Sequence, residues 1–223
     1  MTAPARKETI SSRVLADLRT AILRADLAPG AKINLDQLRE RFQTSISPLR
    51  EALARLTADG LVLFEDQRGF RVAPVSEAEL DDIQAMRLTL EVSALREAVR
   101  HGGMDWESDI IRSLHRLSRT SPAADAAQWL GSHDAFHLAL IAGTPRLLLR
   151  KSCAVLMDLS RRYRSLTGLA GDGDSGPDGH EALAAATLGR DADKAADCLS
   201  RHFEAERAAL ARSFTLVQRV PLS

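Results

Sequence analysis

The sequence predicts a mostly α-helical protein in two parts, an N-terminal winged helix-turn-helix and a C-terminal antiparallel bundle of helices. Three observations lead to this prediction. Three short amphipathic patterns before residue 60 are followed by two short β-rich runs. From residue 76 onward, apolar side chains recur at helical spacing almost throughout. Aromatic residues make up only 4% of the chain, which is typical of a bundle packed with Ala and Leu.

The composition places the chain among globular proteins and excludes several other classes. Of its 223 residues, 45% are hydrophobic and 27% are charged. The sequence has no apolar run of the ~18 residues that a membrane span needs, and its N-terminus is too polar for a signal peptide. We therefore expect a cytoplasmic protein without a membrane partner. Cys153 and Cys198 are too few for a disulfide framework, so we expect reduced packing residues.

Charge is divided unevenly along a chain whose net charge is zero. Residues 1–74 carry 12 basic and 9 acidic side chains, a balance of +3, whereas residues 75–223 carry 18 and 21, a balance of −3. This division favours an N-terminal part that approaches a polyanion.

The first 75 residues contain the signals of a winged helix-turn-helix. Helices are predicted over residues 9–25, over about ten residues from Asn34, and from Ser45 or Ser47 to Gly60. The runs LVLFE and GFRVA, joined by the turn DQRG, predict a hairpin over residues 61–73. The predicted domains are therefore 1–75 for DNA binding and 76–223 for the bundle.

A long helix is predicted to open the bundle, with Ser76 and Glu79 as its capping box and the Gly102–Gly103 pair as its stop. Further helices are predicted over residues 105–119, 122–142, 145–167, 177–189 and 191–213. The glycine-rich and aspartate-rich stretch 168–179 lacks the features of a phosphate-binding loop, and we interpret it as a mobile loop.

The second helix of a helix-turn-helix enters the major groove of DNA and presents its first residues to the base edges. Hydroxyl groups, backbone amides and arginines hold the phosphates. The residues placed to do so here are Arg39, Arg41, Ser45, Ser47, Pro48 with its neighbouring amides, Arg50, and Gln67 and Arg68 at the hairpin tip. The alternative is an ordinary three-helix subdomain with solvated arginines.

The stretch LDQLRERFQTSISPLREALARLTADGLVLFEDQRGFRVAPVS resembles the DNA-binding domain of GntR-family bacterial transcription regulators. The resemblance covers residues 10–75. It implies that Ser45, Ser47, Arg50 and the wing residues Arg68 and Gly69 match the DNA contacts of the family. Ile46 stands where the family often has Arg, at a position expected to touch bases.

Four of the six histidines lie at positions that suggest a metal site. His133 and His137 are four residues apart, so they share one face of a helix, while His180 and His202 belong to two later helices. Imidazoles from facing helices can converge in the core of a bundle and bind a metal ion there. The alternative is a set of polar or half-buried histidines. His101 and His115 are expected at the surface.

The C-terminal part resembles the FCD ligand-binding domain of the FadR subfamily over roughly residues 77–215. The matching segments are RLTLEVSALREA, HDAFHLALIAGTPRLL and GHEALAAATLGRDADKAADCLSRHF. In that family an Asp and three His often hold a divalent ion, and His137, His180 and His202 match the three histidines. The Asp position is His133 here with Asp134 beside it, and either could complete a site for Zn, Ni or Mn.

A bound cation beside arginines would attract a small carboxylate effector. Arg87 and Glu91 match the Arg-x-x-x-Glu pattern of the FCD domain, and Arg161 and Arg164 lie on a facing helix. The alternative for these side chains is a solvated charged face. Resemblance to the branch that senses short dicarboxylates such as glutarate implies a C4–C6 dicarboxylate.

The sequence therefore predicts a transcription regulator, most consistent with a repressor, that binds double-stranded operator DNA as a homodimer. In this interpretation a carboxylic acid at a metal site in the bundle controls the affinity for DNA. The alternatives are a metal-dependent enzyme that uses a metal-bound water at the histidines, and a constitutive DNA-binding protein whose bundle is purely structural. We expect no enzymatic activity.

Overall fold

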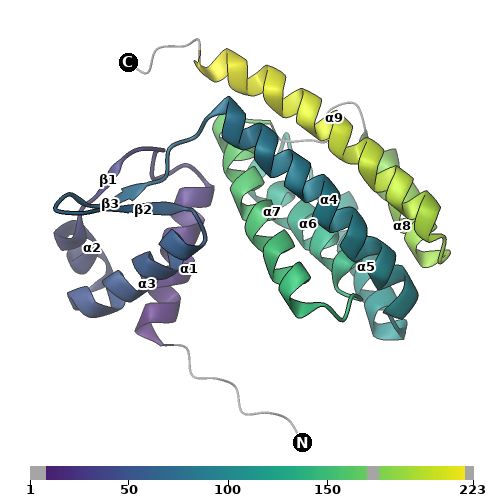
Figure 1. The fold of residues 1–223 in the computed structure, drawn as a ribbon, viewed down its shortest axis with the longest axis horizontal. Coiled ribbons are helices and arrows are strands. Elements are labelled where there is room, and N and C mark those ends of the chain that lie inside the picture. The colour runs from purple at the N-terminus through teal and green to yellow at the C-terminus, as the bar shows by residue number, and fades with distance from the viewer. Residues whose placement is uncertain (1–8, 170–175, 219–223) are drawn as a thin grey trace, which may run out of the picture. The chain divides into compact units, whose positions relative to one another are not determined.

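The computed structural model describes residues 9–169 and 176–218, and the chain divides into two compact units between Val75 and Ser76 (Figure 1). The mostly helical fold class is confirmed. Within the described ranges, no helix combines the length and the apolar character needed to cross a bilayer.

The N-terminal unit contains three helices, α1 (Ile10–Leu23), α2 (Leu35–Phe42) and α3 (Ile46–Ala58). Asn34 caps α2 as predicted, because its Oδ1 accepts hydrogen bonds from the amides of Asp36 and Gln37. Ser45 is the residue before α3, but its side chain makes no capping hydrogen bond. The first backbone amides of α3 are therefore not capped by the Ser45 hydroxyl.

The sheet of this unit has three strands rather than the two of the predicted hairpin. β2 (Val62–Glu65) and β3 (Gly69–Val72) form the hairpin, and β1 (Lys32–Ile33) pairs antiparallel with β3, giving the order β1-β3-β2. Ile33 lies opposite Phe70. A two-residue strand is too short to show the alternating pattern of a β-strand, so no pattern in the sequence predicts it.

The buried face of α3 fixes which of its side chains face solvent. Leu49, Leu53 and Leu56 are fully buried, and α1 supplies the buried residues Val14 and Leu18 to the same unit. Because an α-helix repeats every 3.6 residues, this leucine face turns the polar residues at the start of α3 outward.

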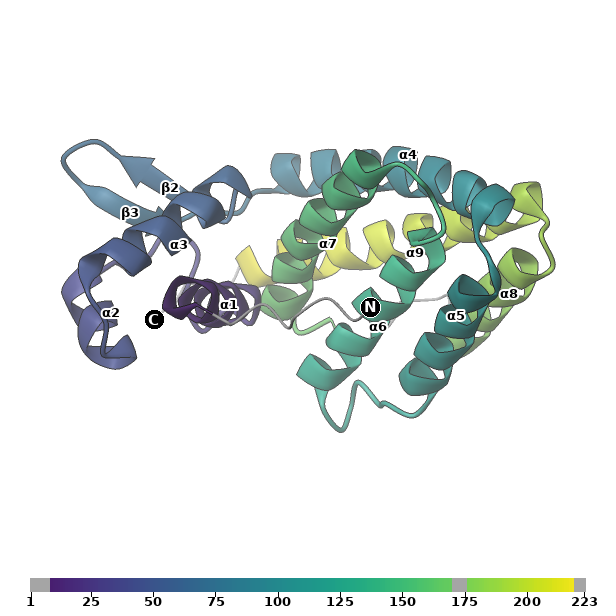
Figure 2. The same ribbon diagram turned by 90° about the horizontal axis from the view of Figure 1, so that it is seen from below.

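The C-terminal unit is a bundle of six helices among the described residues: α4 (Glu77–His101), α5 (Met104–Ser118), α6 (Ala126–Ile141), α7 (Leu147–Thr167), α8 (Gly176–Leu188) and α9 (Ala192–Gln218). α4 packs against α6, α7 and α9, while α5 packs against α6 and α8 (Figure 2). Every helix predicted here exists, although several ends differ from the prediction.

Two of these ends differ by several residues. α6 begins at Ala126 rather than residue 122, because Asp125 accepts a hydrogen bond from the amide of Gln128 and so caps the helix there. α9 continues to Gln218 rather than 213. The predicted loop 168–179 is shorter in the described part of the chain, since Gly168 ends α7 with a φ of 64° and α8 begins at 176. Residues 170–175 of that loop lie outside the described residues.

The first turn of α4 is tied to α7. Ser76 caps α4 by accepting a hydrogen bond from the amide of Glu79, and its own amide donates to the Tyr163 hydroxyl at 3.1 Å. The same hydroxyl donates to the Glu79 carboxylate. Burial together with this hydrogen bond raises the pKa of Tyr163, so the hydroxyl stays protonated and available as a donor.

The turn between α4 and α5 is packed against Trp106. A Cβ at Gly102 would lie 2.1 Å from the Trp106 ring, whereas a Cβ at Gly103 would meet nothing within 4 Å. The ring is itself held in place, because its Nε1 donates to the carbonyl oxygen of Ala139 at 2.9 Å.

We therefore expect Gly102→Ala to destabilise the C-terminal unit by about 1–3 kcal/mol, since a fixed ring has to move. Gly103→Ala should cost less than about 1 kcal/mol. Urea unfolding monitored by tryptophan fluorescence measures the free energy of unfolding of this unit alone, because both tryptophans, Trp106 and Trp129, belong to it. Equal losses in the two variants would contradict the packing argument.

Candidate functional site

The start of α3 presents the predicted DNA-reading side chains to solvent. Ser45, Ile46, Ser47 and Arg50 are exposed, and Pro48 is half-buried in the first turn. Among the described residues, no ion pair engages the Arg50 guanidinium. A helix N-terminus carries partial positive charge and unpaired amides, so this end of α3 suits a phosphate or a base edge.

The wing and α2 supply further exposed cations to the same unit. The Arg68 side chain is 79% exposed and lies 4.0 Å from Glu65, while Arg39 lies 3.7 Å from Asp36. Such long, exposed contacts contribute little, so both arginines are free to exchange them for phosphates. Gln67 and Gly69 both have positive φ values, of 62° and 84°, which form the tight tip of the hairpin.

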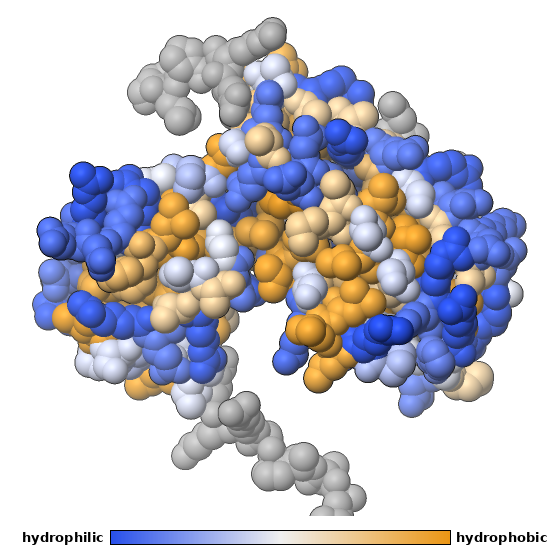
Figure 3. Space-filling view, viewed as in Figure 1, coloured by the Kyte–Doolittle hydropathy of each residue, from blue (hydrophilic) through white to orange (hydrophobic). Residues whose placement is uncertain are grey.

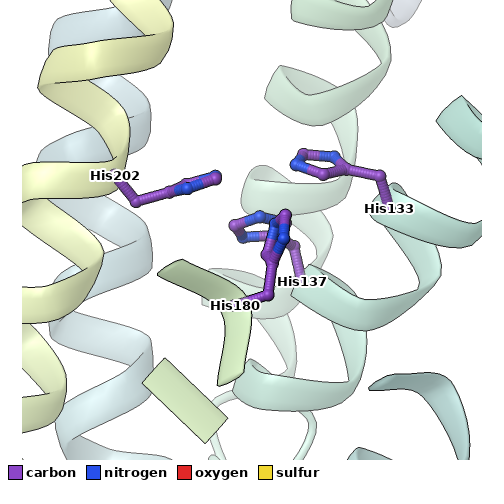
Figure 4. Close-up of side chains that lie close together, drawn as sticks. All are labelled: His133, His137, His180 and His202. Carbon is purple, nitrogen blue, oxygen red and sulfur yellow. The ribbon is translucent and has the colours of Figure 1, made fainter. Parts of the chain in front are cut away.

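The C-terminal unit gathers four histidines in its interior. His133 and His137 come from α6, His180 from α8 and His202 from α9 (Figure 4). One nitrogen from each ring lies within 4.8 Å of the others, and all four side chains are buried. The rings of His137 and His202 have their centroids 4.9 Å apart, and those of His180 and His202 4.8 Å apart. The sequence prediction that these residues converge matches this geometry.

The electrostatics of this histidine cluster favour a bound cation. Burial, followed by the neighbouring His133 and His202, lowers the pKa of His137 well below its ordinary value, so the ring is neutral and can bind a metal. Neither ring nitrogen of His137 has a hydrogen-bond partner among the described residues. Buried polar atoms normally have partners, so a divalent cation between the rings fits this donor set.

The structure places Asp134 beside the histidine cluster rather than in it. The fourth nitrogen comes from His133, whose Nδ1 lies 3.6 Å from the Asp134 carboxylate. Asp134 pairs with Arg161 at 3.2 Å, and both side chains are partly exposed. Arg161 is thus engaged with Asp134, and of the two alternatives for the fourth ligand the geometry favours His133.

A buried charge network lies next to the histidine cluster. Arg87 donates to Glu91 and to Glu206, both at 2.8 Å, and to the Ser160 hydroxyl at 3.0 Å. Arg164 donates to Glu206 through Nε at 3.1 Å and forms an ion pair with its other oxygen, with Nη2 at 2.8 Å from Oε2. We call these five residues the Arg87–Glu206 network. All of them are buried, so the alternative of a solvated charged face is wrong for Arg87, Glu91 and Arg164.

The two carboxylates of the network differ in charge state because they differ in partners. Burial raises the pKa of Glu91 to about 7, since the attraction of Arg87 alone does not offset the loss of water. Burial acts on Glu206 in the same direction, but Arg164 and Arg87 together hold its pKa well below the usual range. Glu206 is therefore the firmly ionised partner of both arginines.

The network also touches the histidine cluster. The Glu91 carboxylate lies 4.0 Å from Nδ1 of His137, and the Glu206 carboxylate lies 4.0 Å from Nε2 of His202. Glu206 and Ser160 were not predicted from the sequence as site residues. The signal for Glu206 was its position four residues after His202, which places both side chains on one face of α9.

Taken together, a winged helix-turn-helix with free cations at its reading helix and a helical unit with a buried polar site define a DNA-binding transcription regulator. The comparisons agree. Residues 10–72 match the model of bacterial regulatory proteins of the gntR family, and residues 82–205 match the FCD domain. The chain belongs to the GntR family of regulators, in the group that carries an FCD domain.

Similar proteins support this assignment. The chain is 35% identical over 195 residues to the HTH-type transcriptional repressor GlaR of Escherichia coli (strain K12), a match that covers 83% of this chain and 88% of the relative. It is 34% identical over 208 residues to the regulator BphR of Paraburkholderia xenovorans (strain LB400), covering 90% and 84%. The solved structure of E. coli McbR/YncC has a TM-score of 0.79 at 23% identity, covering 92% of this chain and 99% of that one, and so shares the fold.

The histidine cluster gives a direct test of metal binding. Replacing His180 by Ala removes one of the four nitrogens, so His180→Ala should contain much less metal per chain than the wild type after purification in the same medium. His115→Ala is the matched control, because His115 is exposed on α5. Elemental analysis measures the metal content, and a full complement in His180→Ala would remove the site.

Proposed function

We propose that this protein is a repressor whose affinity for operator DNA is controlled by a small dicarboxylate bound beside a metal ion in the C-terminal unit. The observation that carries the proposal is that the histidine cluster lies 4.0 Å from Glu91 and Glu206, the glutamates that pair with the buried arginines of the Arg87–Glu206 network. A cation offers coordination positions to carboxylate oxygens, and guanidinium groups pair with the same oxygens.

Charge balance favours an effector with two negative charges. In the network two arginines face two glutamates, so the ionised carboxylates do not exceed the arginines. A divalent ion held by four neutral imidazoles would then leave two uncompensated positive charges in a buried site. Buried charge without a partner is costly, so a dianion is the preferred ligand. A C4–C6 dicarboxylate has this charge.

The ligand set also bears on the metal. The four candidate ligand atoms of the histidine cluster are all imidazole nitrogens, and none is a carboxylate oxygen. Imidazole suits zinc and nickel, whereas carboxylate oxygen suits manganese. Of the three candidate ions, zinc or nickel therefore matches this chain better than manganese. When bound, the ion would supply a positive charge that attracts the acid, and the four imidazoles would hold the ion in place.

Control of DNA binding follows from a difference in affinity. An acid that binds more tightly to one arrangement of the chain than to another shifts the population toward the first. If the favoured arrangement binds DNA poorly, the acid releases the operator. We propose repression relieved by the ligand, since the E. coli relative is named a transcriptional repressor.

We also propose that the protein acts as a homodimer. One winged helix reads only half of an operator, and twofold proteins bind twofold sites. Figure 3 shows apolar side chains gathered on the visible face of the C-terminal unit, over α4 and α7. Met86 on α4 is 52% exposed, and Leu147 and Leu148 on α7 are 57% and 77% exposed. A second copy of this chain would cover such a face.

The DNA-reading role of α3 predicts the effect of one substitution. Arg50→Ala should weaken binding to a selected operator by about 1–3 kcal/mol for each half-site, because it removes a cation that can pair with guanine or phosphate. Arg55→Ala is the matched control, since Arg55 lies in the last turn of α3 and pairs with Glu51 at 2.9 Å. Fluorescence anisotropy with one-half-site and two-half-site DNA measures affinity and stoichiometry. Equal losses for the two variants would remove the assignment.

The effector proposal is tested on the complex of the whole chain with its operator. Glutarate should release the DNA, and should do so less well after chelation of the metal, since the cation provides part of its binding site. Butyrate, with one charge, should be much weaker. Release that is independent of the metal, or equal for the two acids, would contradict the charge argument. Conversion of the acid into a product would instead favour the enzyme alternative.

A further inference from the structure

The Glu206 carboxylate forms ion pairs with both buried arginines, Arg87 and Arg164, at the same time. Its Oε1 accepts from Nη1 of Arg87 at 2.8 Å and from Nε of Arg164 at 3.1 Å, and its Oε2 lies 2.8 Å from Nη2 of Arg164. The Ser160 hydroxyl lies 3.3 Å from Oε1. Two guanidinium groups and one hydroxyl thus lie around a single carboxylate, and charged hydrogen bonds of this kind are stronger than neutral ones.

The arginines have further contacts that do not depend on Glu206. Arg87 also donates to Glu91, and its guanidinium lies 4.6 Å from the centre of the Phe203 ring. The Arg164 guanidinium lies 5.7 Å from the centre of the Trp129 ring. Cation–π contacts of this kind hold a guanidinium in position, so the donors stay oriented when their carboxylate partner is exchanged.

The position of the Glu206 carboxylate matches the one an effector needs. Glu206 is 1% exposed, Arg87 3% and Arg164 2%, so no solvent-facing side of either arginine is left for an incoming acid. The carboxylate also lies 4.0 Å from Nε2 of His202, at the edge of the histidine cluster. An acid that contacts both arginines and the cluster would have to take the place that Glu206 fills.

We propose that Glu206 is an internal stand-in for the effector carboxylate. It holds the two arginines in the ligand-free protein and gives them up when the acid binds. The inference rests on the proposed function, because it concerns the same site. Glu206 lies on α9, one turn after His202 of the histidine cluster. Exchange of its carboxylate for that of the acid therefore changes the conformation of α9 at this turn.

The stand-in role and a merely structural role predict effects of opposite sign. An internal competitor lowers the apparent affinity for the ligand, because only the fraction of protein in which the competitor has left the site can bind the ligand. Removing the competitor therefore tightens binding. If Glu206 only supported the arginines, its removal would misplace them and weaken binding.

The experiment is calorimetric titration of glutarate and succinate into the full chain, with the metal content of each sample measured. Glu206→Gln should bind the acids about tenfold more tightly than the wild type. Glu206→Asp keeps the charge but is one methylene shorter, so it cannot reach both arginines as well and should also bind more tightly, by a smaller factor. Glu206→Asp keeps the buried negative charge, so the prediction can still be tested if Glu206→Gln does not fold.

Glu91→Gln is the matched control for charge. It removes one buried carboxyl group, as Glu206→Gln does, but leaves Glu206 on both arginines, so it should tighten binding less. Equal tightening in the two Gln variants would assign the effect to charge alone and overturn the stand-in role. Weaker or unchanged binding in both Glu206 variants would overturn it as well. If neither acid binds the wild type or any variant, the proposed effector site itself is removed, and this inference with it.

Discussion

The interior of the C-terminal unit depends on the mutual neutralisation of buried arginines and glutamates. Removing Arg87, Arg164 and Glu206 from water carries a large cost, which only close pairing with full hydrogen bonding offsets. Replacing such ions by apolar side chains would often be neutral for stability or better. A buried network of this kind therefore points to a use in binding, and here it borders four imidazoles that could hold a metal ion.

One helix connects the two halves of this site. α9 carries His202 in the histidine cluster and Glu206 in the charge network, one turn apart on the same face. α4 and α7, which both pack against α9, supply Arg87 and Arg164. A metal ion and an acid bound here would act on the same few turns of these helices. The side chains that would bind these ligands are consequently the same ones that pack the interior of this unit.

Local signals predicted most of the fold and part of the site. The spacing of leucines in α3 and the cap at Asn34 are short-range patterns, and both are found in the structure. The positions of the four histidines suggested a metal site, and the spacing of four residues paired His133 with His137 on one helix face. Resemblance to a family then matched His137, His180 and His202 to its three histidines. β1 and Glu206 were missed for one reason: each gains its role from a partner distant in sequence, β3 for the strand and Arg87 with Arg164 for the carboxylate. No period in the sequence records such a pairing.

The attachment of α4 has a mechanical consequence. Only residues 73–75 separate the last strand of the wing from Ser76, and Ser76 is fastened to α7 through the Tyr163 hydroxyl. These three residues are the covalent link between the two units, and Arg87 lies on the helix that begins just after it. Any movement of Ser76 relative to the winged helix-turn-helix therefore has to be taken up by the backbone dihedral angles of residues 73–75.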